Sequence, residues 1–332
     1  MRKYLFKAIS LLCILALLTA LVACGNGESG NTESGEIVYH TVSFNTNGGT
    51  AIASVEVRNG RKISEPEIPV LENYIFCHWE MSDGRTWFFD SKSVTEDITL
   101  DAVWIKAEDL FGLAPMPDGN GIMITEIKRQ EEFSLLKIPS VINGKEVRGI
   151  ADGAFIGVHK NHAERIVFPD TLTYIGAEAF TNASEVILNF TGTVTYLGES
   201  AFDNAASLSK ISLGEGLESI AYRAFMNCTS LRTIDIPKGV TVIEENAFEM
   251  CSSLVTIVLP ASLTSVESNA FEDCDKLKTV FYHGTEQEYD NMSIASGNEK
   301  LEDARVYYYS EEEPAEEGVF WHYDRNGSPV IW

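Results

Sequence analysis

One repeated pattern specifies the fold, and its clearest copy is Leu231-Arg-Thr-Ile-Asp-Ile-Pro-Lys-Gly-Val-Thr-Val-Ile-Glu-Glu-Asn-Ala-Phe248. Its apolar residues are spaced to bury one face of an extended segment, and a proline then ends the strand. Two further apolar positions and an Ala-Phe pair follow within the same stretch. The residues predicted to point inward are Leu231, Ile234, Ile236, Val240, Ile243 and Phe248.

The Ala-Phe pair of this stretch recurs along the chain at Phe155, Phe180, Phe202, Phe225, Phe248 and Phe271, in steps of 25, 22, 23, 23 and 23 residues. A period of 20–29 residues is typical of a leucine-rich solenoid, in which no coil can bury its apolar face alone. The sequence therefore predicts stacked coils with one strand per coil of about 23 residues.

Equivalent positions in successive coils carry apolar residues, so each column is expected to form a continuous apolar spine. The first column is Phe168, Phe190, Leu213, Ile236, Leu259 and Tyr282. The second is Leu172, Val194, Leu217, Val240 and Leu263, and the third is Ile175, Leu197, Ile220, Ile243 and Val266.

The repeated pattern resembles the BspA-type leucine-rich repeat of bacterial surface proteins, and Ile138-Pro-Ser-Val-Ile-Asn-Gly144 to Ile150 resembles that family's usual first coil. The resemblance covers about 122–285. Two coils depart from it: one carries an insertion around His159-Lys-Asn-His162, and the next is one residue short near Val186. Both departures are expected to distort the stack locally without breaking it.

Residues 39–105 have a different texture, with alternating segments, turn signals and an aromatic core. Val42-Ser-Phe44-Asn-Thr-Asn-Gly48-Gly49-Thr50 and Tyr74-Ile-Phe76-Cys-His-Trp79 resemble the internalin-type B repeat, as does the segment from Val94 to Trp104. The resemblance implies a small β-grasp-like module that serves as a spacer or a weak binding unit and brings no catalytic residues.

The N-terminus predicts export and lipid anchoring. A basic segment precedes a 16-residue apolar run, Ala8 to Ala23, which is shorter than the roughly 20 residues of a membrane-spanning helix and suits a signal peptide. Leu21-Val-Ala-Cys24 resembles the lipobox of bacterial lipoproteins, which implies cleavage before Cys24 and lipidation of its thiol; the alternative is an ordinary secretory signal. The expected location is the extracellular face of the bacterial cell membrane.

The predicted organisation is a signal peptide (1–23), a flexible tether (24–38), the B repeat (39–105), a connector (106–121), the solenoid (122–285) and a β-rich C-terminal cap (286–332). The fold class is mainly β. The net charge of −24 becomes −27 once Arg2, Lys3 and Lys7 leave with the signal. Such acidity argues against nucleic acid and against direct docking on anionic lipid, and leaves the lipid anchor as the only membrane contact. We expect a monomer.

The sequence lacks the phosphate loops, metalloprotease, hydrolase and calcium motifs that would indicate an enzyme, so we expect no catalytic activity, no cofactor and no metal. His159 and His162 are the best metal candidates, although an exposed insertion explains them better. Cys228, Cys251 and Cys274 recur every 23 residues, where earlier coils place Ala, and are expected to be buried packing residues.

The outward face of the strand ladder remains as the candidate binding surface for an extracellular protein or a glycan. The candidate residues are Thr233, Asp235, Thr256, Val258, Thr279 and Phe281. Phe281 is expected to be the main anchor, because it does not point into the coil. Two alternatives stay open: a structural spacer of the cell envelope without a ligand, and an enzyme or solute receptor, which would need a two-lobed α/β pattern.

Replacing Cys24 with Ser tests the lipid anchor. The variant should stay uncleaved or be released and should no longer partition into detergent, since it lacks the thiol that receives the lipid. Metabolic labelling with a fatty acid provides the measurement. Label that persists in the variant would contradict lipidation at Cys24.

Overall fold

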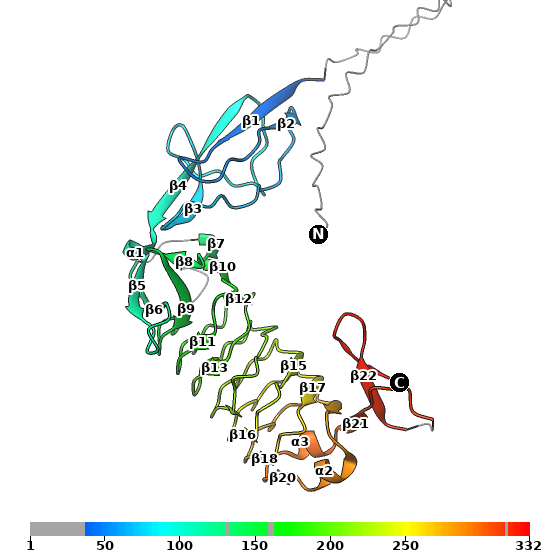
Figure 1. Ribbon diagram of the computed structural model, residues 1–332. Helices are drawn as coiled ribbons and strands as arrows, with labels where there is room; N and C mark the ends of the chain where they lie inside the picture. Colours follow the sequence, from blue (N-terminus) through cyan, green and yellow to red (C-terminus); the bar gives the residue numbers. More distant parts are fainter. Residues whose placement is uncertain (1–36, 130–132, 159–162, 316–317) are drawn as a thin grey trace, which may run out of the picture. The chain divides into compact units, whose positions relative to one another are not determined.

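The computed structural model describes residues 37–129, 133–158, 163–315 and 318–332 (Figure 1). The predicted signal peptide, Cys24, the tether before residue 37 and the His159–His162 insertion lie outside the described residues. No helix within the described ranges is long and apolar enough to cross a membrane. The mainly β solenoid expected from the sequence is confirmed, with about eight turns.

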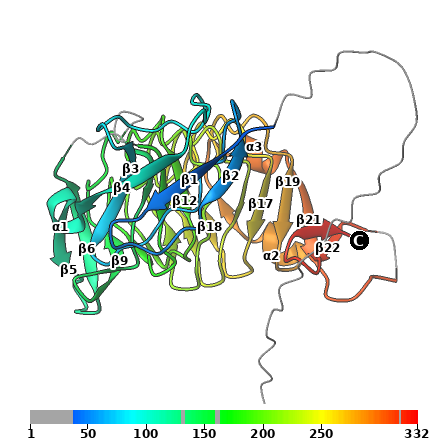
Figure 2. The ribbon, with the colours of Figure 1, turned by 90° about the horizontal axis from the view of Figure 1, so that it is seen from above.

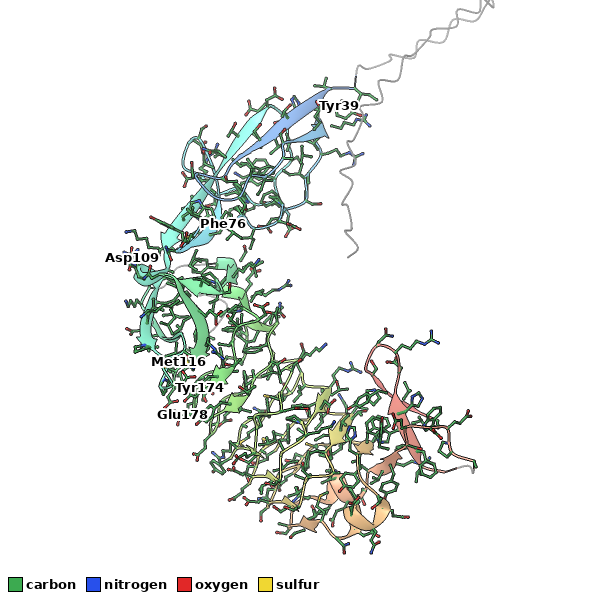
Figure 3. The ribbon with its side chains drawn as sticks, in the orientation of Figure 1. Tyr39, Phe76, Asp109, Met116, Tyr174 and Glu178 are labelled. Atoms are coloured by element: carbon green, nitrogen blue, oxygen red, sulfur yellow. The ribbon has the colours of Figure 1, made fainter. Side chains whose placement is uncertain are left out.

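The N-terminal module is a four-stranded mixed sheet in the order β2-β1-β4-β3. β1 and β4 are parallel, and the other pairs are antiparallel. Its strands are β1 (Tyr39–Asn45), β2 (Val55–Arg58), β3 (Tyr74–Met81) and β4 (Ile98–Lys106). The aromatic core predicted here is present: Trp79 is buried and contacts the rings of Phe44 and Phe76, the latter labelled in Figure 3.

The region 106–121, which the sequence assigns to a connector, packs into the start of the solenoid. It contains α1 (Ala107–Leu110) and β5 (Phe111–Pro115), and the side chains of Leu110 and Phe111 are fully buried in the solenoid core. The next strands are β6 (Ile122–Ile127), β7 (Phe133–Lys137), β8 (Val141–Ile142) and β9 (Lys145–Ile150). β5 pairs with β6, and β6 with β9, so the connector extends the solenoid's sheet.

Each regular coil contributes one strand to a parallel ladder. The first ladder sheet is β12-β10-β7 and the second is β15-β17-β19-β21-β22-β23. The strands are β10 (Ala163–Phe168), β12 (Ile187–Phe190), β15 (Thr233–Asp235), β17 (Thr256–Leu259), β19 (Thr279–Tyr282), β21 (Arg305–Tyr309), β22 (Phe320–Tyr323) and β23 (Pro329–Ile331). The solenoid pairing therefore continues past residue 285, where the sequence placed its end.

Each coil also carries a second, two-residue strand, where the sequence predicted only inward-turning side chains. These strands lie side by side in Figure 1 and form a second set of parallel pairs. They are β11 (Tyr174–Ile175), β13 (Tyr196–Leu197), β14 (Ser219–Ile220), β16 (Val242–Ile243), β18 (Ser265–Val266) and β20 (Ser293–Ile294). The ladder strand and this short strand together give two sheets along the stack.

The Ala-Phe pairs form the central column of the core. Phe180, Phe202, Phe225, Phe248 and Phe271 are fully buried, and successive ring centroids lie 5.2, 5.6, 5.2 and 5.3 Å apart with nearly parallel planes. Phe155 begins the column with a ring tilted by 33°. Cys228, Cys251 and Cys274 are also fully buried, as predicted, and each thiol donates to the backbone carbonyl of a Phe.

Both sheets are interrupted at the same step of the stack. Neither β12 with residues 210–213 nor β13 with β14 forms a regular pair. Leu213 makes an isolated bridge with Val194, although its equivalent in the preceding coil is Phe190. This coil follows the one that is a residue short. The predicted distortion is present, and the Phe column continues across this step. The hydrogen bonding between strands of successive coils, however, is interrupted there.

The last coil closes around two short helices, α2 (Glu286–Asp290) and α3 (Glu299–Glu302), which lie near β21 in Figure 2. Thr285 and Glu288 form a capping box at the start of α2. Asn298 is fully buried; its side-chain amide donates to Glu267 and Ala295 carbonyls, and its oxygen accepts from the Phe271 N–H. These bonds satisfy backbone groups that the next coil would otherwise pair.

Replacing Phe225 with Ala should lower the free energy of unfolding by about 3–5 kcal/mol, because it leaves a cavity between two stacked rings. Phe155→Ala should cost less, since Phe155 has a column neighbour on one side only. Chemical denaturation of both variants provides the comparison. A Phe225 variant as stable as the parent protein would show that the column is not the core.

Candidate functional site

The six predicted binding residues lie in register on one face of the second ladder sheet. Thr233, Thr256 and Thr279 are paired across β15, β17 and β19. Asp235, Val258 and Phe281 form the next outward row. We call the outward face of these three strands the ladder face. The threonines and Asp235 are exposed or half-buried, so a partner can reach them.

The expectation that Phe281 and Val258 are exposed anchors is wrong. They point away from the coil interior, as predicted, but they are only 6% and 3% exposed. Both belong to a small separate core with Tyr307 and Trp321. Substituting them therefore removes packing from the protein itself, so a variant at these positions would change the fold as well as any binding.

The cover is the C-terminal hairpin of β22 and β23, which pairs onto the edge of β21 and folds over the ladder face. Trp321 is its anchor, with no exposed surface. The indole Nε1 donates to the Tyr282 carbonyl at 3.0 Å, and the ring lies 5.1 Å from that of Phe281. The sequence predicted that this tail caps the last coil. The hairpin instead covers the ladder face, and the sequence could not show this because hydropathy does not indicate the face onto which an aromatic segment folds.

A cleft of about 900 Å³ remains where the ladder face meets the hairpin, and we call it the ladder cleft. The cleft is lined by segments of the ladder strands and by aromatic and charged side chains. Its lining includes Lys210, Ser212, Leu213, Glu215, Thr233, Asp235, Lys238, Thr256, Phe281, His283, Tyr309, Tyr323 and Ser328. Its volume lies in the usual range for ligand sites, about 300–1,000 Å³.

A chain of hydrogen bonds crosses the cleft and ties the hairpin to the ladder. The Tyr323 hydroxyl donates to Asp235 Oδ2 at 3.0 Å. His283 Nε2 lies 3.0 Å from the same hydroxyl oxygen. Because the tyrosine proton is directed to Asp235, Nε2 must carry the hydrogen of the second bond. Asp235 and the hairpin are 88 residues apart in sequence, so only the fold brings them together.

The cleft perturbs each member of this chain. Desolvation raises the pKa of Asp235, and the hydrogen bond from Tyr323 opposes that rise. Desolvation, with a smaller effect of Lys238, lowers the pKa of His283. Burial and the nearby Asp235 carboxylate raise the pKa of Tyr323. The shifts of His283 and Tyr323 favour the neutral imidazole and the protonated phenol, and with Asp235 these groups offer donors and acceptors to a bound molecule.

Tyr309 supplies an aromatic surface at the cleft. Its side chain is 37% exposed, and its ring packs on Trp321 and His283 at centroid distances of 5.2 and 5.1 Å. The sequence predicted Tyr309 only as part of the β-rich C-terminal cap (286–332) and did not indicate a role in the site. The aromatic density of this cap was the available signal. The place of Tyr309 in the same cleft as Asp235 follows only from the strand pairing of β21.

The structure offers no alternative metal or thiol site in its described part. No group of three or more His, Cys, Asp or Glu side chains is positioned to hold a metal ion among the described residues. Burial raises the pKa of Cys274 to about 12 and raises those of Cys228 and Cys251, so these thiols are protonated at neutral pH. They act as packing residues in the core.

Comparison with protein families identifies both parts of the chain. Residues 125–232 and 176–299 match the BspA type leucine-rich repeat region. Residues 40–103 match the Listeria-Bacteroides repeat domain. Two proteins of Evansella cellulosilytica, both named as membrane proteins, are 39% identical over 71 residues, or 21% of this chain. The matched segment spans 11% and 8% of their lengths.

Solved leucine-rich repeat structures are also similar. A leucine-rich cell surface protein from Faecalibacterium prausnitzii is 24% identical, with a TM-score of 0.38, over 55% of this chain and 40% of its own. A leucine-rich repeat protein of T. pallidum is 25% identical, with a TM-score of 0.36, over 60% of this chain and 84% of its own.

Trp321→Ala should release the hairpin from the ladder face, because it removes the central side chain of the small core, a change that typically costs about 3–5 kcal/mol. Amide hydrogen exchange should quicken over residues 320–331 and stay unchanged in β16. Trp332→Ala is the comparison variant: Trp332 is 42% exposed, stacks on His322 and donates its indole N–H to the Ser310 carbonyl, so its loss should quicken exchange less than loss of the buried Trp321. Equal exchange in the two variants would contradict the anchor role of Trp321.

Proposed function

The chain belongs to the BspA-type leucine-rich repeat family, and we propose that it is a lipid-anchored bacterial surface protein that binds an extracellular protein or glycan in its ladder cleft. Leucine-rich repeat proteins generally serve as non-enzymatic binding scaffolds, and the families that these comparisons show are not enzyme families. The ladder cleft is the observation on which the proposed binding function rests.

Three properties of the ladder cleft support binding. It is large enough for several residues or sugar rings. Its wall presents an exposed tyrosine ring, Tyr309, and a hydrogen-bonding row that includes Asp235 and Thr233. The hairpin that forms its other side is fixed by a buried tryptophan, so the site is organised before a ligand arrives and loses less entropy on binding.

The proposed anchor at Cys24 gives the binding domains a place at the cell surface. A diacyl lipid holds a protein at a bilayer more firmly than one chain can, because each buried methylene contributes about 0.8 kcal/mol. The acidic tether and the B-repeat module would then separate the solenoid from the membrane. The composition of the tether supports this spacing role, since residues 25–38 contain almost nothing that could be buried.

One observation favours the second candidate, a structural spacer without a ligand. The two apolar residues that the ladder face could have offered to a partner, Val258 and Phe281, are covered by the protein's own hairpin. Interfaces draw most of their affinity from such buried anchors. A binding role must therefore use Tyr309 and the polar row, and these are the groups to test.

Tyr309→Ala in the full chain, displayed on cells, should weaken adhesion to an array of extracellular proteins and oligosaccharides about 10-fold, since an aromatic contact in a cleft is a typical binding hot spot. Tyr196→Ala is the matched control: Tyr196 is 49% exposed and lies on β13, outside the cleft lining. Adhesion that is equal for both variants and depends only on chain length would favour the spacer.

A further inference from the structure

The floor of the ladder cleft is a seam between two strand edges that do not pair. Residues 210–213 occupy the ladder position before β15, and both segments line the cleft. Within the described chain, no backbone hydrogen bond or β-bridge joins 210–213 to 233–235. Elsewhere in the second ladder sheet, from β15 to β23, each strand is paired with the next.

The bonds on the other side of β15 show which backbone groups face the seam. Thr256 N–H donates to the Arg232 carbonyl, and Ile236 N–H donates to the Val258 carbonyl. Alternate residues of a strand direct their N–H and C=O groups to opposite edges. The backbone groups of Thr233 and Asp235 therefore point away from β17 and into the seam.

The opposite edge is displaced and cannot satisfy these groups. Val194 N–H donates to the Ser212 carbonyl, and Gly214 N–H donates to the Val194 carbonyl. The backbone groups of Leu213 consequently also face the seam. The shift of this bridge, to Val194 in place of Phe190, moves residues 210–213 out of ladder register. Two rows of backbone donors and acceptors thus meet without pairing.

From these observations we propose that the ladder cleft binds an extended peptide segment of a partner protein, which adds as a β-strand to the free edge of β15. The inference rests on the proposed binding function and names the ligand class. Free strand edges pair readily with another chain, and folded proteins normally cover them. Main-chain bonds give affinity in such complexes, and pockets for alternate side chains give selectivity.

The geometry of the edge favours a peptide over a glycan. Thr233 and Asp235 are two residues apart, so their donor and acceptor groups repeat at about 6.6 Å, the two-residue rise of a strand. A peptide backbone has the same repeat. Side chains on its outward face would meet Tyr323, which contacts Asp235, while the charges of Lys210, Lys238 and Asp235 select among sequences.

The test pans a display library of linear 12-residue peptides against the full chain and measures the selected peptides by calorimetry. Thr233→Pro removes the N–H that faces the seam and leaves the bonds to β17 in place, so peptide affinity should fall about 10-fold or more. Thr233→Ala is the matched comparison, because it removes the same side chain and keeps that N–H; the further loss of affinity in Thr233→Pro then measures the backbone hydrogen bond. Circular dichroism and thermal unfolding check the fold of both.

Peptide analogues keep the test decisive if Thr233→Pro does not fold. N-methylation should abolish binding to the parent protein at alternate residues only, since only every second peptide N–H faces β15. Binding that tolerates N-methylation at every position, or a library that yields no peptide competing at the cleft, overturns the strand-addition inference. An oligosaccharide array run on the same chain separates the two proposals: Tyr309-dependent glycan binding without peptide binding overturns the inference and retains the proposed function.

Discussion

Successive coils of equal length stack in register, and this register holds the solenoid together. A single coil of about 23 residues cannot form a hydrophobic core. Its apolar side chains are buried only if the next coil places equivalent residues directly above them. The Phe column expresses this constraint most directly, with parallel rings 5.2–5.6 Å apart over five coils. Hydrogen bonds between coils can form only when that register is kept.

Departures from equal length produce the features that distinguish this chain from a uniform stack. A single missing residue near Val186 leaves the Phe column continuous, yet the ladder segment at 210–213 falls out of register and both sheets stop. Apolar packing tolerates such a shift because it is not directional, whereas backbone hydrogen bonds require alignment. The shorter coil therefore leaves the apolar core continuous but leaves one edge of β15 unpaired.

The C-terminal hairpin turns part of a flat ladder face into a cleft. Its Trp321 covers Val258 and Phe281, and the Asp235–Tyr323–His283 chain fixes it at a second point. Covering these apolar residues removes the surface that would favour nonspecific association. The cleft then offers a tyrosine ring, a polar row and unpaired backbone groups, which suits a selective binder.

Period and apolar spacing were enough to predict the solenoid, its Phe column and the buried Cys228, Cys251 and Cys274, because each depends on local spacing repeated along the chain. The outward rows, from Thr233 to Phe281, could be placed in register for the same reason. The cover over Phe281, the meeting of Asp235 with Tyr323 and the unpaired edge of β15 could not be foreseen. They depend on where a distant tail docks and on how a one-residue deletion is absorbed, and only long-range packing and backbone alignment in the folded chain decide these.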